Sequence, residues 1–276
     1  MSVADSLEIV NVSDVGLRRP HNEDSTLTDP AQGLVILADG MGGYKAGEVA
    51  SAIAVTAIHH AVTAGLKRSG RNRADKGQGD GLSPVSLLVK QAVVDANNGI
   101  YATAQKEPQC QGMGTTVVVV LFHDSRLTIA HVGDSRLYRK RGANFAQVTR
   151  DHSLIQELID RGLYTPEEAA KKTPKNLVTR ALGIEPRVDV DVAEDKALPE
   201  DVYLLCSDGL NDMVADEEIH LTLSKYSANL LQAAEELVRL ANSKGGRDNT
   251  SVILIRVRNN LSNSGNWLSR LKGRFS

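Results

Sequence analysis

The fold is decided by a stretch in which five apolar residues run into a carboxylate and then into glycines, Leu34-Val35-Ile36-Leu37-Ala38-Asp39-Gly40-Met41-Gly42-Gly43. A short apolar run bounded by glycine predicts a buried strand that ends on Asp39. The glycines allow backbone amides and carbonyls to come close to whatever that carboxylate binds. An Asp-Gly turn after a strand is ordinary loop chemistry by itself. The interpretation therefore depends on what accompanies it.

Four further acidic turns lie at the edges of apolar or strand-like runs, Asn22-Glu23-Asp24, Gly133-Asp134-Ser135, Ser207-Asp208-Gly209 and Arg247-Asp248-Asn249. Repeated acidic strand ends predict carboxylates that converge on a metal cluster. Hard ions such as Mg²⁺ and Mn²⁺ prefer oxygen ligands. Two of them about 3.5–4 Å apart activate water and polarise a phosphoryl group. Arg18 and Arg19 lie just upstream of the first acidic turn, and an arginine fork suits the geometry of a phosphate.

Composition excludes several classes of function. A formal net charge of −2 over 276 residues predicts no general affinity for nucleic acid or anionic membrane. Cys110 and Cys206 stand alone, without zinc-site spacing, and predict a reducing, cytoplasmic setting. Residues 1–12 carry no signal-peptide pattern, and the apolar run at residues 117–122 is too short to span a bilayer. Neither a P-loop nor a Gly-x-Ser-x-Gly elbow is present.

Hydrophobic patterning predicts an α+β protein. Strands are expected at residues 9–15, 34–38, 116–122, 126–132, 136–140, 144–148, 188–192, 202–206 and 251–257, and helices at residues 46–66, 84–105, 216–223 and 227–242. Short turns separate many of the strands, which favours antiparallel sheets. Capping patterns beginning at Ser153 and Thr165 predict two short helices in a lid-like insertion. Ser83, followed by Pro84, is expected to cap the helix at residues 84–105, and Asp216 is expected to cap another. Residues 67–83, rich in Gly, Lys, Arg and Asp, are expected to form a flexible loop.

Six motifs, in this order, carry a resemblance to a known family: Arg19-x-x-Asn22-Glu23-Asp24, Asp39-Gly40-Met41-Gly42-Gly43, Gly114-Thr115-Thr116, Gly133-Asp134-Ser135-Arg136, Ser207-Asp208-Gly209-Leu210 and Gly246-Arg247-Asp248-Asn249. The set resembles the metal-dependent Ser/Thr protein phosphatases of type 2C (PPM family) in their bacterial form. The resemblance implies a four-layer α-β-β-α sandwich of two antiparallel sheets flanked by helices. It also implies a catalytic domain over residues 1–257, with a flap at about 151–182 and a basic amphipathic tail at 258–276.

The resemblance also implies a ligand set for two ions, Mg²⁺ or Mn²⁺. Asp39 would bridge both ions, and the carbonyl oxygen of Gly40 would bind one of them. Asp208 and Asp248 would complete the shell of the second ion. The family's mechanism is in-line attack by a metal-bridging hydroxide, without a phosphoenzyme.

Further roles carry over with one departure. Glu23 and Asp24 would act on the metals directly or through bound water, and Arg19 would bind the substrate phosphate. Asp134 would join Asp208 in a third, weaker metal site. Some members have a histidine, proposed as the general acid, where this chain has Met41. Methionine cannot donate a proton, so the general acid is open, and a metal-bound water is the hypothesis for that role.

The function implied is hydrolysis of phosphoserine and phosphothreonine on proteins by a cytoplasmic, monomeric enzyme that opposes a Ser/Thr kinase. One alternative is a phosphatase acting on small phosphoesters. Another is a non-catalytic module that docks phosphoproteins or senses metal. His131 is interpreted as a core residue, and His152 as either a structural residue or one that approaches substrate. The apolar and basic residues around Trp267 allow either membrane contact or a disordered tail.

Overall fold

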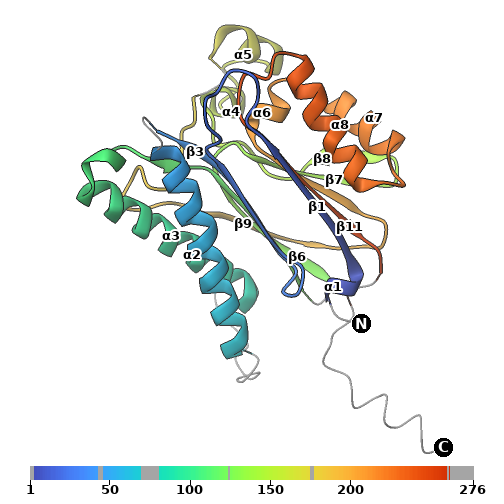
Figure 1. Cartoon of the computed structure of the whole chain (residues 1–276), viewed down its shortest axis with the longest axis horizontal. Coiled ribbons are helices and arrows are strands. Elements are labelled where there is room, and N and C mark those ends of the chain that lie inside the picture. Colours follow the sequence, from blue (N-terminus) through green and yellow to red (C-terminus); the bar gives the residue numbers. More distant parts are fainter. Residues whose placement is uncertain are drawn as a thin grey trace, which may run out of the picture.

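The computed structural model describes residues 3–42, 46–69, 81–123, 125–174, 177–259 and 261. Two antiparallel sheets pack face to face, and helices lie over the outer face of each (Figure 1). This is the α-β-β-α sandwich that the sequence predicts.

Each sheet is assembled from strands distant in sequence. The first has the order β1-β11-β10-β7-β8, with β1 at Leu7–Asp14, β11 at Thr250–Val257, β10 at Val202–Cys206, β7 at Arg136–Arg141 and β8 at Asn144–Gln147. The second has the order β2-β3-β5-β6-β9, with β2 at Asp24–Asp29, β3 at Leu34–Met41, β5 at Val117–His123, β6 at Arg126–Val132 and β9 at Asp191–Lys196. A short strand, β4 (Gly114–Thr115), pairs with the end of β3.

The helices separate into the two outer layers and the flap. Their bounds are α1 (Val3–Ser6), α2 (Ala46–Ser69), α3 (Pro84–Lys106), the 3-10 helix η1 (Pro108–Cys110), α4 (Leu154–Asp160), α5 (Pro166–Lys172), α6 (Asp208–Asn211), α7 (Asp216–Lys225) and α8 (Leu230–Ser243). Helices α2 and α3 cover the second sheet, whereas α7 and α8 cover the first. By length and hydropathy α2 resembles a membrane span, but it buries Ala50, Ala54 and Ile58 against the second sheet and α3.

The core strands and hairpins match the sequence predictions, whereas the two edge strands of the second sheet do not. The β5–β6 and β7–β8 hairpins form as expected. No strand was predicted at β2, and β9 lies at Asp191–Lys196 rather than at residues 188–192. Both are edge strands with polar sequences, so their residues lack the hydrophobic alternation that marks a half-buried strand.

Some of the predicted helix ends are confirmed by the structure, and others are not. Ser83 caps α3 through a bond from the Ser86 amide, as predicted, and Thr165 forms the expected capping box of α5. Asp216 is the first residue of α7 rather than its cap, because Ala215 occupies the cap position. The one-turn helix α6 was not predicted.

The structure differs from the prediction at the internal loop of residues 67–83 and at the C-terminal boundary of the domain. Helix α2 continues through Ser69, so part of the expected 67–83 loop is helical, and residues 70–80 lie outside the described residues. Leu261 is buried in the core between the sheets, and its carbonyl accepts a hydrogen bond from the Ser125 hydroxyl at 2.6 Å. The packed domain therefore extends past residue 257. Residues 262–276, the rest of the predicted tail, also lie outside the described residues.

Candidate metal centre and phosphate site

Acidic residues from five segments meet at the end of the sandwich opposite α1. The segments are the β1–β2 loop with the start of β2, the end of β3, the β6–β7 turn, the start of α6 and the loop before β11 (Figure 1). They supply the predicted carboxylates Glu23, Asp24, Asp39, Asp134, Asp208 and Asp248. The β2–β3 register sets Asp24 opposite Asp39, and Ser207, beside Asp208, donates to Asp24. Asn249, beside Asp248, accepts from the Glu23 amide, and Ser135, beside Asp134, hydrogen-bonds Thr116, which binds the Asp39 amide. These contacts gather the carboxylates into one cluster.

Asp39 is held by the main chain and by two threonines. Strand β3 was predicted to end at Asp39. It continues to Met41 instead, because its last residues pair with β4. The Asp39 amide donates to Thr116 Oγ1 at 3.1 Å, and its carbonyl accepts from Thr115 Oγ1 at 2.8 Å and from the Thr116 amide at 2.9 Å. The Gly-Thr-Thr motif therefore fixes the main chain that carries the Asp39 carboxylate, which the resemblance places between two ions.

Asp24 lies directly opposite Asp39 in the β2–β3 register. Its Oδ2 accepts hydrogen bonds from the Ser207 hydroxyl at 2.8 Å and the Ser251 hydroxyl at 2.6 Å. Its Oδ1 is buried and has no hydrogen-bond partner among the described residues. Burial raises the pKa of Asp24 to about 6, in spite of the two hydroxyls that stabilise the charged form. An unsatisfied buried carboxylate oxygen is the kind of group that binds a cation.

Burial and the repulsion of neighbouring charges also destabilise the charged forms of the other buried carboxylates. Burial raises the pKa of Asp39, and the charges of Asp24 and Asp208 raise it further. Burial, followed by the charges of Asp134 and Asp248, raises the pKa of Asp208. The pKa of Asp134 rises to about 6, chiefly through burial. Oxygen donors of this kind suit hard divalent ions such as Mg²⁺ and Mn²⁺, whose charge would offset the repulsion.

Two glycines of the motifs are required because backbones approach each other closely. A Cβ on Gly40 would lie 2.2 Å from the carbonyl oxygen of Gly47 at the start of α2. A Cβ on Gly209 would lie 2.0 Å from the carbonyl oxygen of Asn249. At Gly40 the close contact is therefore with the backbone of α2, and the approach of backbone groups to a bound ion stays a prediction. Gly43, the last residue of the motif, lies outside the described residues.

Asn249 organises the loop that carries Glu23. Its Oδ1 accepts from the Glu23 amide at 2.8 Å, and its Nδ2 donates to the carbonyls of Val15 and His21, both at 2.9 Å. Sequence reasoning included Asn249 in a motif without giving it a role, and it assigned no role to Ser207, Ser251 or the two threonines. Their positions beside acidic residues or at strand starts were the available signal.

Arg19 lies at the mouth of the carboxylate cluster. Its Nη2 donates to Asp248 Oδ2 at 2.6 Å, and this hydrogen bond raises the pKa of the guanidinium. The side chain is half exposed and lines a cavity of about 490 Å³ together with Asp208 and Asp248. Arg18 is not among the described residues that line this cavity. The structure therefore places Arg19, and not Arg18, on this cavity beside the carboxylates.

The family model described as protein phosphatase 2C matches residues 18–243. The chain belongs to the protein phosphatase 2C family. It is 39% identical over 246 residues to the serine/threonine protein phosphatase PstP of Mycobacterium tuberculosis, covering 89% of this chain but 44% of PstP, less than half its length. It is 37% identical over 249 residues to the serine/threonine phosphatase Stp of Listeria welshimeri, covering 88% of this chain and 93% of the relative. The solved catalytic domain of PstP in complex with two manganese ions has a TM-score of 0.76 at 38% identity, over 92% of this chain and 99% of that one. The predicted family is confirmed.

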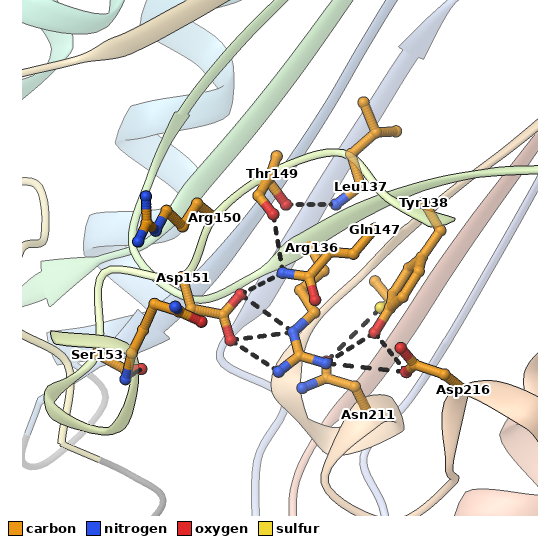
Figure 2. Close-up of polar contacts among 12 residues, drawn as sticks. Arg136, Leu137, Tyr138, Gln147, Thr149, Arg150, Asp151, Ser153, Asn211 and Asp216 are labelled. Atoms are coloured by element: carbon orange, nitrogen blue, oxygen red, sulfur yellow. Dashed lines mark hydrogen bonds and ion pairs between the residues drawn. The ribbon is translucent and has the colours of Figure 1, made fainter. Parts of the chain in front are cut away.

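The predicted flap starts at Asp151, and a hydrogen-bond network centred on Arg136 binds this residue (Figure 2). Its Nε and Nη2 donate to both carboxylate oxygens of Asp151, the first residue of the predicted flap, at 2.7–3.1 Å. Its Nη1 donates to the Tyr138 hydroxyl at 2.7 Å, and that hydroxyl donates to Asp216 at 2.9 Å. Gln147 adds a bond to Asp151 at 2.7 Å. The network ties the flap to β7, β8 and α7.

His152, the next residue, faces the protein interior. Its Nδ1 accepts from the Gly133 amide at 3.0 Å, and its own amide donates to the Gly133 carbonyl at 3.0 Å. This double contact fixes the turn that carries Asp134, which agrees with the structural interpretation of His152. His131, Asp191 and His152 have ligand-type atoms within 4.8 Å of one another. However, the guanidinium of Arg180 already bonds Asp191 at 2.8 Å and occupies the cation's role there.

Proposed function

We propose that this chain hydrolyses the phosphate esters of phosphoserine and phosphothreonine in proteins, using two Mg²⁺ or Mn²⁺ ions and a weaker third ion. One observation carries the proposal: buried carboxylates from distant segments converge beside Arg19, and a buried oxygen of Asp24 has no hydrogen-bond partner among the described residues. Family membership and the two manganese ions of the related PstP catalytic domain support the reaction and the choice of ion.

The proposed ligands follow the geometry of the cluster. Asp39, the Gly40 carbonyl, Asp208 and Asp248 would hold the two central ions. Glu23 and Asp24 would contribute directly or through water, and Asp134 would hold the third ion with Asp208. When bound, the two central ions lower the pKa of a water molecule and polarise the phosphoryl group.

The chain's own residues orient the substrate and hold these ligands in place. Arg19 donates to the phosphate oxygens, and its bond to Asp248 keeps the guanidinium beside the carboxylates. The hydroxyls of Thr115 and Thr116 fix the main chain at Asp39, so that carboxylate needs little reorganisation on binding. Met41 offers no proton, so protonation of the leaving group falls to water.

The proposed setting follows from the family and the composition. Substrates are phosphorylated proteins, and a Ser/Thr kinase of the same cell produces them. The enzyme acts as a monomer in the cytoplasm. The proposed catalytic domain extends through Leu261 and includes the flap at residues 151–182. The near-neutral net charge of −2 favours proteins over nucleic acids as partners.

The test is phosphate release from a phosphothreonine peptide by the full chain with Mn²⁺, with EDTA, and with Asp39→Asn. Asp95→Asn is the matched control, because Asp95 is an exposed carboxylate on α3. We expect metal-dependent turnover that the control keeps and both EDTA and Asp39→Asn remove. Turnover that persists in Asp39→Asn would show that the site is wrongly assigned.

Two measurements address the alternatives. Metal binding by calorimetry without turnover would favour a non-catalytic module. A kcat/KM for p-nitrophenyl phosphate that exceeds the value for the phosphopeptide would favour a phosphatase of small esters.

A further inference from the structure

The cavity beside Arg19 has a wall that the proposed reaction does not use. Its lining comprises Arg19, Asp208 and Asp248, which the reaction employs, and Gly209, Asp212, Met213 and Arg247, which have no role in it. At about 490 Å³ the cavity is larger than a phosphate group requires. The remaining space is available to a part of the substrate next to the phosphorylated residue.

Arg247 lines the part of the cavity that the reaction does not use, and among the described residues it has no counter-ion. Its side chain is exposed, and it makes no hydrogen bond or ion pair with any residue that the structure describes. Arg19 and Arg136, in contrast, each bond a carboxylate. A free guanidinium presents a planar fork of donors that matches a carboxylate.

The backbone holds Arg247 at a fixed offset from the phosphate site. Gly246 has a φ of +50°, its carbonyl accepts from the Leu17 amide at 2.8 Å, and an added Cβ would lie 2.7 Å from the Leu17 side chain. Asp248, which follows Arg247 directly, bonds Arg19. Arg247 therefore directly precedes the residue that holds the Arg19 guanidinium, and both arginines line the same cavity.

We propose that this cavity is a subsite for an acidic side chain of the substrate, close in sequence to the phosphorylated residue, and that Arg247 is the cation that binds it. The proposal rests on the proposed function, because Arg19 must hold the phosphate for Arg247 to meet a neighbouring residue. Arg247 is then a specificity-determining residue that favours Asp or Glu over Lys beside the phosphorylated threonine.

The experiment compares two phosphothreonine peptides that differ only in carrying Glu or Lys at the two positions on each side of the phosphothreonine. For the wild-type full chain with Mn²⁺ we expect kcat/KM to be about fivefold higher for the Glu peptide, as for an exposed ion pair. The difference should reside in KM, because the contact is made equally in the ground and transition states. It should shrink as ionic strength rises.

Three variants make the result specific to Arg247. Arg247→Ala should bring the ratio of the two kcat/KM values close to one, and Arg247→Glu should invert it. Arg18→Ala removes the same charge from a neighbouring exposed arginine that does not line the cavity, and it should keep the wild-type ratio.

Failure of the subsite is distinguishable from failure of the proposed function. Equal kcat/KM for both peptides in the wild type, or a preference that Arg247→Ala leaves intact, would overturn the subsite while turnover itself stands. Absence of metal-dependent turnover on either peptide would overturn the proposed function, and the subsite with it.

Discussion

Replacing Asp24 with asparagine is expected to stabilise the metal-free protein at neutral pH, although it removes a proposed metal ligand. Burial raises the pKa of Asp24 from its ordinary value of 3.8 to about 6. The folded protein therefore holds the Asp24 proton over a pH range in which the unfolded chain has released it. The resulting penalty on folding is absent below about pH 4, grows between the two pKa values and is constant above about pH 6. A rise of this size corresponds to about 3 kcal/mol.

Asparagine keeps the shape and loses the charge. Its carbonyl oxygen can still accept from the Ser207 and Ser251 hydroxyls, and its amide can donate to Asp39, which lies opposite in the register. At pH 7.5 in EDTA we therefore expect the variant to be more stable by about 3 kcal/mol. For a chain of this size that corresponds to a rise in Tm of about 6–12 °C.

The assay is urea unfolding in EDTA at several pH values, with the variant compared with the wild type at each. His131 and His152 have pKa values lowered by burial, so their contribution to stability falls as pH drops below about 6.5. That opposite trend is common to both proteins and cancels in the difference. A saturating excess of Mn²⁺ should stabilise the wild type by a few kcal/mol and the variant by less.

Asp160→Asn is the control of opposite sign. Its carboxylate is exposed, and its pKa is lowered by Arg150, so removing the charge should slightly destabilise the protein at pH 7.5. An Asp24→Asn protein that is less stable than the wild type at pH 7.5 in EDTA would refute the reasoning. So would a stability difference that does not change between pH 4 and pH 7.5.

Three further predictions concern the supports of the site and the fold. Arg136→Lys keeps the charge but cannot bond both Asp151 oxygens and the Tyr138 hydroxyl together. We therefore expect the free energy of unfolding in urea to fall by about 2 kcal/mol and the flap to be proteolysed faster. Unchanged proteolysis would contradict the role of the network. Gly209→Ala should cost about 3 kcal/mol or more, because the new Cβ would lie 2.0 Å from a carbonyl oxygen of the loop before β11. Gly99→Ala, in open space within α3, should stabilise by about 0.5–1 kcal/mol, and equal effects of the two alanines would be the contrary result. Ser83→Ala should lower the free energy of unfolding by about 1 kcal/mol through loss of the α3 cap, whereas Ser83→Asn should retain most of it.

The sequence by itself determined the elements whose signals are local. An apolar run such as residues 117–122 favours a buried strand, and Ser83 followed by Pro84 favours a helix start, so the core strands and α3 were predictable from neighbours in the chain. The order of the motifs was sufficient to indicate the family. It was also sufficient to select the carboxylates that the fold gathers at one end.

Only the tertiary structure decided how those carboxylates are held. Asp24 depends on hydroxyls from residues 207 and 251, and the Glu23 loop depends on Asn249, contacts that span more than 180 positions of the chain. The edge strands β2 and β9 likewise form because β3 and β6 offer unpaired backbone, and their own polar residues carry no signal of it. Hydrogen bonds and like-charge repulsion act across space, and a pattern along the chain records them only when both partners are close in sequence.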